Sequence, residues 1–251
     1  MSIQNQHIVI TGGGSGVGAD LARHFTDQQA KVTILGRRLD PLKAIASGTG
    51  ALALSCDVTD SQAVVNAIAE AKRINGSITV AIANAGAAPS TQFHKMTSDD
   101  LSATLDVNLK GVFHLWQAVL ADMKQAGWGR LIAVASTAGL KGYPYVSGYC
   151  AAKHGVIGLT RSLAHELGNT GITVNAICPS FIETPMLERS IDNIVEKTGM
   201  TPEKAAKILY ADNPQRRFIQ TDEVAATALW LCSEGARSVN GHNLNITGGE
   251  I

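Results

Sequence analysis

Seven short apolar runs, separated by stretches with helical periodicity, are the feature that most constrains the fold. Most runs are apolar at nearly every position, which is typical of strands buried on both faces of a parallel sheet. The alternation predicts an α/β fold with right-handed crossovers, and therefore one doubly wound parallel sheet of about seven strands. The runs are His7–Thr11, Lys31–Leu35, Ala51–Cys56, Thr79–Ala83, Arg130–Ala135, Ile172–Ile177 and Asn243–Ile246.

Two stretches between these runs have a clear helical pattern. After the first run, Val17, Leu21 and Phe25 fall four residues apart, which puts them on one face of a helix. The stretch Tyr149–Gly168 repeats this pattern over a greater length, and Gly168 itself is a suitable stop signal. We expect such helices to cover both faces of the sheet.

The segment 181–220 departs from this alternation. It has no strand pattern and instead carries helical patterns around Leu187–Val195 and Ala205–Tyr210. Ligands of doubly wound sheets bind beyond the carboxyl ends of the strands, so we interpret these two helices as a small cap over that edge. An ordinary helical hairpin that completes the core is the alternative.

Composition narrows the class of protein. The chain has 251 residues, of which 45% are hydrophobic, and its 21 basic residues balance 21 acidic ones. So apolar a chain can fold, and its length suits one domain spanning residues 1–251. The absence of a basic excess argues against nucleic acid or an acidic membrane surface as the main partner.

Location and metal binding are predicted from the termini and the cysteines. The N-terminal residues carry no signal-peptide pattern, and no apolar run approaches the length of a membrane span. The four cysteines lie in apolar segments without C-x-x-C spacing, so we expect buried reduced thiols and no metal site. These observations predict a cytoplasmic protein.

A glycine-rich turn, Thr11–Gly18, directly follows the first predicted strand and opens the first predicted helix. Glycines allow a tight turn and the close approach of a pyrophosphate, which then meets the N–H groups of the helix N-terminus. The turn therefore predicts a nucleotide site in a Rossmann-type fold, although a merely flexible turn would have the same composition. The candidate residues are Gly12, Gly14, Ser15, Gly16, Val17 and Gly18.

Together with four further motifs, this turn resembles the short-chain dehydrogenase/reductase family over the whole chain. The spacing of the turn is T-G-x-x-x-G-x-G, and a Tyr-x-x-x-Lys motif lies 13 residues beyond a serine that ends the fifth run. The resemblance implies a nicotinamide-dependent oxidoreductase with a catalytic tetrad of Asn108, Ser136, Tyr149 and Lys153. It implies cofactor contacts by Asn84, Ala85, Gly86, Tyr149 and Lys153, by Asp57 and Val58 near the adenine, and by Pro179, Phe181, Ile182 and Thr184 near the nicotinamide.

The chemistry of the Tyr-Lys pair agrees with this resemblance. Tyr149 and Lys153 are four residues apart on one predicted helix, so both project from the same face. We expect the ammonium to lower the pKa of the phenol, which would donate a proton to a carbonyl oxygen during reduction. Ser136 can hydrogen-bond the same oxygen. By resemblance, Lys153 also holds the nicotinamide ribose, and Asn108 keeps a water molecule in place for proton relay.

The choice of cofactor depends on the end of the second predicted strand. NAD enzymes have a carboxylate there for the ribose 2′-hydroxyl, whereas this chain has Gly36 followed by Arg37 and Arg38. Guanidinium groups suit a 2′-phosphate, so the sequence favours NADP(H). NAD(H) remains possible if the two arginines only solvate a loop.

The predicted substrate wall is apolar and carries no charge that could hold a free carboxylate. The motif around the sixth run resembles 3-oxoacyl reductases of acyl-carrier-protein or coenzyme A thioesters, whereas the cap resembles 3-hydroxybutyrate dehydrogenases. The wall residues are Ala138, Leu140, Tyr143, Val146, Phe181 and Leu187.

We therefore hypothesise an NADP(H)-dependent reductase that converts a 3-oxoacyl thioester to its 3-hydroxyacyl form. A dehydrogenase of a small hydrophobic secondary alcohol or ketone, or of 3-hydroxybutyrate-like substrates, is the alternative. A non-catalytic NADP-binding regulator is a remote one. The family resemblance also implies a homotetramer.

Overall fold

The computed structural model describes residues 3–251, and Met1 and Ser2 of the N-terminal segment considered above lie outside this range. Seven parallel strands form one sheet, as the sequence predicts, and their order in the sheet is β3-β2-β1-β4-β5-β6-β7. The strands are β1 His7–Thr11, β2 Lys31–Gly36, β3 Leu52–Ser55, β4 Val80–Ala83, β5 Gly129–Val134, β6 Ile172–Pro179 and β7 Asn243–Ile246.

β1 and β7 have the expected bounds, and the ends of the other strands differ from the expected ones by at most two residues. The largest difference is at β6, which continues to Pro179 because Pro179 pairs with Ile246 of β7. A proline is tolerated at the end of a strand, where the missing N–H group breaks no ladder bond.

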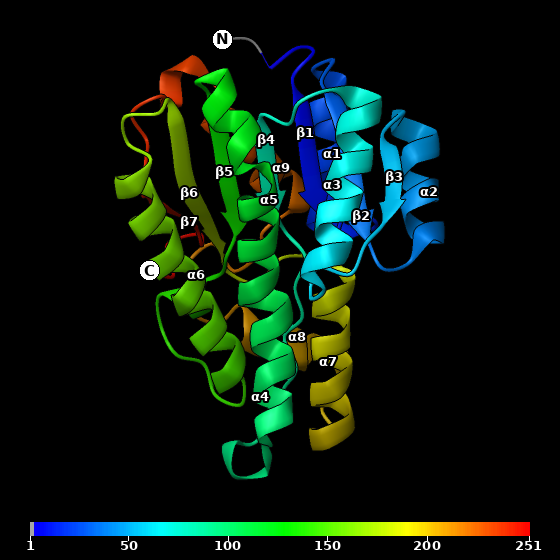
Figure 1. Ribbon diagram of the computed structural model, residues 1–251. Helices are drawn as coiled ribbons and strands as arrows, with labels where there is room; N and C mark the ends of the chain where they lie inside the picture. The colour runs from blue at the N-terminus through cyan, green and yellow to red at the C-terminus, as the bar shows by residue number, and fades with distance from the viewer. Residues whose placement is uncertain (1–2) are drawn as a thin grey trace.

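Helices cover both faces of the sheet, with α3, α5 and α6 on one face and α1, α2 and α9 on the other (Figure 1). The helices are α1 Gly16–Asp27, α2 Leu39–Thr49, α3 Ser61–Asn75, α4 Ser98–Leu105, α5 Gly111–Ala126, α6 Ser147–Glu166, α7 Pro185–Thr198, α8 Pro202–Leu209 and α9 Thr221–Leu231. A π-helical segment, Asp106–Lys110, joins α4 to α5, and 3₁₀ turns occupy Phe93–Lys95, Thr137–Gly139 and Glu234–Ala236.

Each face of the sheet has its own apolar core. Val17, Leu21 and Phe25 of α1 are buried against one face, as their spacing predicts. Leu115 and Val119 of α5 are buried in the core of the other face, so they are not available to a partner subunit. All four cysteines are buried and free. Within the described range, no helix has the length and apolar character needed to cross a bilayer.

The connectivity places a binding edge at the carboxyl ends of the strands. β1 lies beside β4 in the sheet. From β1 the strands continue through β2 to β3 on one side, and from β4 they continue through β5 to β7 on the other. Ligands of such sheets bind at this point, where the strand order reverses. The helices α7 and α8 lie beyond this edge, at the bottom of Figure 1, as expected for a cap. A short parallel bridge between Ile182 and Ile219 closes the base of this cap segment.

Candidate functional site

The glycine-rich turn depends on its glycines for close packing. Gly12 has φ +68°, and its N–H donates to the Leu35 carbonyl at 2.7 Å. A Cβ on Gly18 would lie 2.2 Å from the Gly12 carbonyl oxygen, so only glycine fits there. The Asn84 side chain donates to the carbonyls of Thr11 at 3.0 Å and Gly12 at 3.2 Å. Asn84 therefore ties the end of β4 to the turn through its side chain.

The N-terminus of α1 is arranged to receive an anion. Its N-cap residue, Ser15, makes no side-chain capping bond, and among the described residues no acidic side chain lies in the first helical turn. The first N–H groups of a helix lack intrahelical partners and carry the positive end of the helix dipole. The turn therefore fits the pyrophosphate of a dinucleotide cofactor.

The cap begins directly beside this turn. Thr184 is the N-cap of α7, and its side chain accepts a hydrogen bond from the Leu187 N–H at 3.4 Å. A Cβ on Gly16 would lie 3.0 Å from the Thr184 methyl group. Pro179, by contrast, lies within β6, and Ile182 packs on the core beside α1 and α9.

Both arginines after β2 are exposed, and neither forms an ion pair with another residue of the described range. Arg37 and Arg38 are thus free to meet a phosphate group. Asp57 accepts hydrogen bonds from the Thr59 N–H at 3.0 Å and hydroxyl at 2.8 Å. These bonds lower the pKa of the Asp57 carboxyl, and the positive charge of Arg37 lowers it further. Val58 is buried and packs close to Gly111.

The residues of the predicted tetrad come together at the carboxyl edge of the sheet. Ser136 follows β5, and its side chain accepts a hydrogen bond from the Ala138 N–H at 3.1 Å. Tyr149 and Lys153 both lie on α6, with the Lys153 ammonium 5.5 Å from the centre of the Tyr149 ring. That ammonium donates to the Val134 carbonyl at 2.8 Å, which anchors it beneath the end of β5.

Asn108 lies in the π-helical segment, a local irregularity that is frequent at functional sites. Its side chain donates to the carbonyls of Ala87 at 2.8 Å and Thr104 at 2.9 Å. A Cβ on Gly86 would lie 2.8 Å from the Asn108 side-chain oxygen and 3.9 Å from the Lys153 nitrogen. Gly86 therefore lets Asn108 and Lys153 approach the end of β4.

The expected effect of Lys153 on the Tyr149 phenol is wrong for this structure. Burial raises the pKa of Tyr149 to about 12, and a hydrogen bond with Ser136 only partly opposes this. Burial also lowers the pKa of Lys153 to about 8, because a desolvated ammonium is costly. The Lys153 ammonium donates to the Val134 carbonyl, and its charge does not offset the effect of burial on the Tyr149 phenol. Tyr149 is accordingly protonated at neutral pH.

The predicted substrate-wall residues occupy different surroundings. Ala138 and Leu187 are buried, and Val146 is the N-cap residue of α6. Leu140 packs against the core beneath α5 and α6. The rings of Tyr143 and Phe181 meet edge to face, with centroids 6.0 Å apart.

This wall is less apolar than the sequence predicts, because a charged group lies behind it. The Tyr143 hydroxyl donates to the carboxylate of Glu250, and Lys141 is ion-paired with the same carboxylate at 2.8 Å. No motif spacing marks Glu250, so its position depends on a tertiary contact that sequence patterns do not contain.

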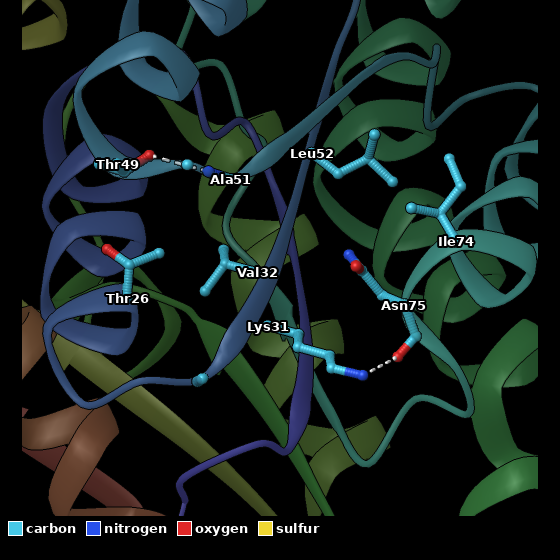
Figure 2. A pocket seen from close by; sticks show the side chains of 10 residues that line it. Thr26, Lys31, Val32, Thr49, Ala51, Leu52, Ile74 and Asn75 are labelled. Atoms are coloured by element: carbon cyan, nitrogen blue, oxygen red, sulfur yellow. Dashed lines mark hydrogen bonds between the residues drawn. The ribbon is translucent and has the colours of Figure 1, made fainter.

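A separate hollow of about 450 Å³ lies at the opposite edge of the sheet (Figure 2). Lys31 and Leu52, which begin β2 and β3, line it together with Asn75 at the end of α3. The Lys31 ammonium donates to the Asn75 carbonyl across it at 3.3 Å. It contains none of the tetrad residues, so it is not the candidate active site.

Comparison with known proteins agrees with the geometry. A short chain dehydrogenase family model matches residues 6–195. D-beta-hydroxybutyrate dehydrogenase of Rhizobium meliloti (strain 1021) is 31% identical over 250 residues, covering 96% of each chain. Acetoacetyl-CoA reductase of Shinella zoogloeoides is 33% identical over 245 residues, covering 97% of each chain.

A solved structure of an actinorhodin polyketide ketoreductase variant with NADPH superimposes with a TM-score of 0.94 at 31% identity. The superposition covers 98% of this chain and 97% of the ketoreductase. The chain therefore belongs to the short-chain dehydrogenase family and is an NAD(P)-dependent oxidoreductase acting on CH–OH groups.

Proposed function

We propose that the protein is an NADPH-dependent reductase that converts a 3-oxoacyl thioester to the 3-hydroxyacyl thioester. The observation that carries this proposal is the convergence of Ser136, Tyr149 and Lys153 beside the glycine-rich turn, where a nicotinamide cofactor fits. A bound NADPH would supply the hydride to the carbonyl carbon.

The chain itself supplies the proton and holds the substrate oxygen. Tyr149, protonated at neutral pH, donates its phenol proton to the carbonyl oxygen as that oxygen gains negative charge. Ser136 donates a hydrogen bond to the same oxygen and orients it. Lys153 holds the nicotinamide ribose, and Asn108, fixed by Ala87 and Thr104, keeps a water molecule for proton relay.

The preference for NADPH is supported by the exposed arginines after β2. Arg37 and Arg38 lie where a 2′-phosphate would meet them, and no carboxylate stands at Gly36 to bind a 2′-hydroxyl. The NADPH in the related ketoreductase structure agrees with this choice. NAD(H) is the alternative cofactor.

The substrate is proposed as a thioester because the wall residues themselves carry no cation for a free carboxylate, and the ammonium behind them, that of Lys141, is already paired with Glu250. Ala138 and Val146 are uncharged, and the charges behind the wall, on Lys141, Glu250 and Asp212, are more acidic than basic. An acidic group near the pocket would repel a carboxylate. The acetoacetyl-CoA reductase relative favours a coenzyme A or acyl-carrier-protein thioester.

Two alternative substrate classes are compatible with the same site. The D-beta-hydroxybutyrate dehydrogenase relative favours a 3-hydroxybutyrate-like substrate, and the apolar part of the wall would suit a small hydrophobic ketone or secondary alcohol. A non-catalytic NADP-binding regulator is disfavoured, since a regulator has no use for the complete set of Asn108, Ser136, Tyr149 and Lys153.

We further propose that residues 1–251 act as one domain in a cytoplasmic homotetramer. The four buried free cysteines suit a reducing compartment. For the tetramer, α4 and α5 present exposed Leu101 and Phe113 on the side away from the sheet core. The proposal includes no membrane or nucleic-acid partner.

The test compares acetoacetyl-CoA with free acetoacetate at a fixed NADPH concentration, following loss of reduced cofactor and identifying the product. The proposal predicts a kcat/KM at least about tenfold higher for the thioester, equivalent to about 1.4 kcal/mol. Preference for acetoacetate would instead support the 3-hydroxybutyrate alternative. Turnover of neither compound would reject both the thioester and the free acid as substrates and leave small hydrophobic ketones.

A further inference from the structure

Glu250 is a buried carboxylate that the proposed reaction does not use. Its side chain is only 3% exposed, and its charge is balanced by the Lys141 ammonium at 2.8 Å. A buried charge is costly unless it is paired and hydrogen-bonded, so this carboxylate is held in a defined place. Lys141 also reaches Asp212, near the end of α8, at 3.5 Å. One ammonium thus links three segments that are distant in sequence.

The second partner of Glu250 is the Tyr143 phenol. Tyr143 donates its hydroxyl proton to Glu250, so its oxygen accepts the hydrogen bond from the Thr137 hydroxyl, 2.7 Å away. Burial and the carboxylate together raise the pKa of Tyr143 above its ordinary value, and the phenol keeps its proton. The Tyr143 ring is therefore fixed at its hydroxyl end from two sides.

This phenol lies next to the catalytic machinery. Thr137 directly follows Ser136, and the Tyr143 ring contacts Phe181, which leads from β6 into the cap. The ring thus stands between the loop that carries the catalytic serine and the loop that opens the cap. A carbonyl substrate with its oxygen at Ser136 and Tyr149 would direct one of its substituents toward this ring.

The chain around Glu250 is itself rigidly placed. Gly248 has φ +60°, and a Cβ there would lie 2.1 Å from the buried Asn213 side chain. The Glu250 N–H donates to the Thr247 carbonyl at 3.2 Å, and the Thr247 hydroxyl donates to the Ile251 carbonyl, also at 3.2 Å. The carboxylate is therefore set by backbone packing rather than by a freely moving tail.

We propose that Glu250 is a positioning residue for substrate specificity, which acts by holding the Tyr143 ring against Phe181 in the wall that receives the acyl chain. This inference rests on the proposed function. Loss of the carboxylate frees the ring and weakens substrate binding, whereas the cofactor, bound at the glycine-rich turn on the other side of Ser136, is unaffected.

The test measures substrate KM, kcat and NADPH KM for Glu250→Ala, Glu250→Gln and Tyr143→Phe with acetoacetyl-CoA. We expect the first and third variants to raise substrate KM about tenfold, with kcat and NADPH KM within about twofold of the parent. Glu250→Gln keeps an acceptor for Tyr143, so its increase should be smaller. Glu70→Gln, which removes a carboxylate paired with Arg73 on the exposed side of α3, is the matched control and should change nothing.

Three outcomes would overturn the inference. An unchanged substrate KM in Tyr143→Phe would do so, even if Glu250→Ala does not fold. A rise of NADPH KM by the same factor would point to general damage. An equal rise of substrate KM in Glu250→Gln and Glu250→Ala would show that the hydrogen bond to Tyr143 is not the cause of the effect.

A double-mutant cycle on thermal unfolding separates this inference from the proposed function. The cycle combines Tyr143→Phe with Glu250→Gln. If the two residues are coupled, the double variant should lose less melting temperature than the sum of the losses of the two single variants. Additive losses of melting temperature would overturn the inference that Glu250 holds the Tyr143 ring, whatever the substrate is. If the parent protein fails to reduce acetoacetyl-CoA, the proposed function falls, while the cycle still decides whether Glu250 holds Tyr143.

Discussion

Thr184, the N-cap residue of the cap helix α7, packs against Gly16 of the glycine-rich turn, so closely that a Cβ on Gly16 would lie 3.0 Å from its methyl group. The turn and the cap are therefore not independent parts. Any side chain added to the turn at this position must displace the start of the cap. Gly16 also has φ +51°, a conformation that costs other residues roughly 1–2 kcal/mol.

Gly16→Ala should therefore impair cofactor binding. We expect the KM for NADPH to rise at least about tenfold, because the strained turn can no longer approach the pyrophosphate. Gly48→Ala is the control, since Gly48 lies within α2 with open space around it. That change should leave KM unaltered and add about 0.5–1 kcal/mol of stability. An NADPH KM within twofold of the parent in Gly16→Ala would contradict this reading of the turn.

Removal of the Tyr149 hydroxyl tests the proton donor. Tyr149→Phe should reduce kcat for carbonyl reduction by about 10²- to 10⁴-fold, the range for general acid catalysis, while NADPH binding persists. Steady-state kinetics and titration of NADPH fluorescence measure the two quantities. Tyr145→Phe is a matched control because Tyr145 is 61% exposed, and it should retain full activity. Substantial turnover by Tyr149→Phe would exclude the phenol as the acid.

Lys153 predicts how the reduction depends on pH. Burial lowers the pKa of its ammonium to about 8. A charged donor binds the nicotinamide ribose more strongly than a neutral amine, so kcat/KM should be level below that pH and decline above it as Lys153 loses its proton. The decline would not reflect unfolding from this group. The unfolded lysine binds more protons between about 8 and its ordinary 10.5, so this group adds stability as pH rises through that window. A pH profile that stays level to pH 10 would contradict the assignment.

His7 predicts the response of the fold to acid. Its ring bonds the Gly76 carbonyl at 2.7 Å and the Thr33 hydroxyl at 2.9 Å, and burial lowers its pKa below 6.5. Between the lowered pKa of His7 in the folded protein and 6.5 in the unfolded chain, the unfolded chain binds more protons than the folded one. The contribution of His7 to folding stability is therefore complete above pH 6.5 and is lost as the pH falls below it. The melting temperature measured against pH should show this loss, and in His7→Gln the acid-induced loss should be smaller. His94→Gln, at an exposed position, should leave it intact.

Much of the fold follows from local patterns. The β1 and β7 boundaries match the apolar runs, and the first helix buries Val17, Leu21 and Phe25, because burial on both faces of a parallel sheet imposes a pattern that is readable in sequence. The family resemblance likewise implied that Ser136 and Tyr149 would meet, and in the structure the two side chains interact.

The remaining features depend on contacts between distant segments. The link from Glu250 to Tyr143 joins residues 107 positions apart, and no propensity or spacing encodes it. The pKa of Tyr149 was predicted in the wrong direction because residue spacing indicates proximity to Lys153, whereas burial of the phenol dominates the shift and raises the pKa. The irregular π-helical turn at Asn108 also has no signature in the hydrophobic pattern.

The central claim is tested most directly by steady-state reduction of acetoacetyl-CoA with NADPH and NADH measured side by side. The account predicts turnover with a kcat/KM for NADPH at least about tenfold above that for NADH, through the 2′-phosphate contact of Arg37. Turnover that prefers NADH would contradict the role of Arg37 while leaving the tetrad in place. The absence of turnover with both cofactors would contradict the assignment of the thioester itself.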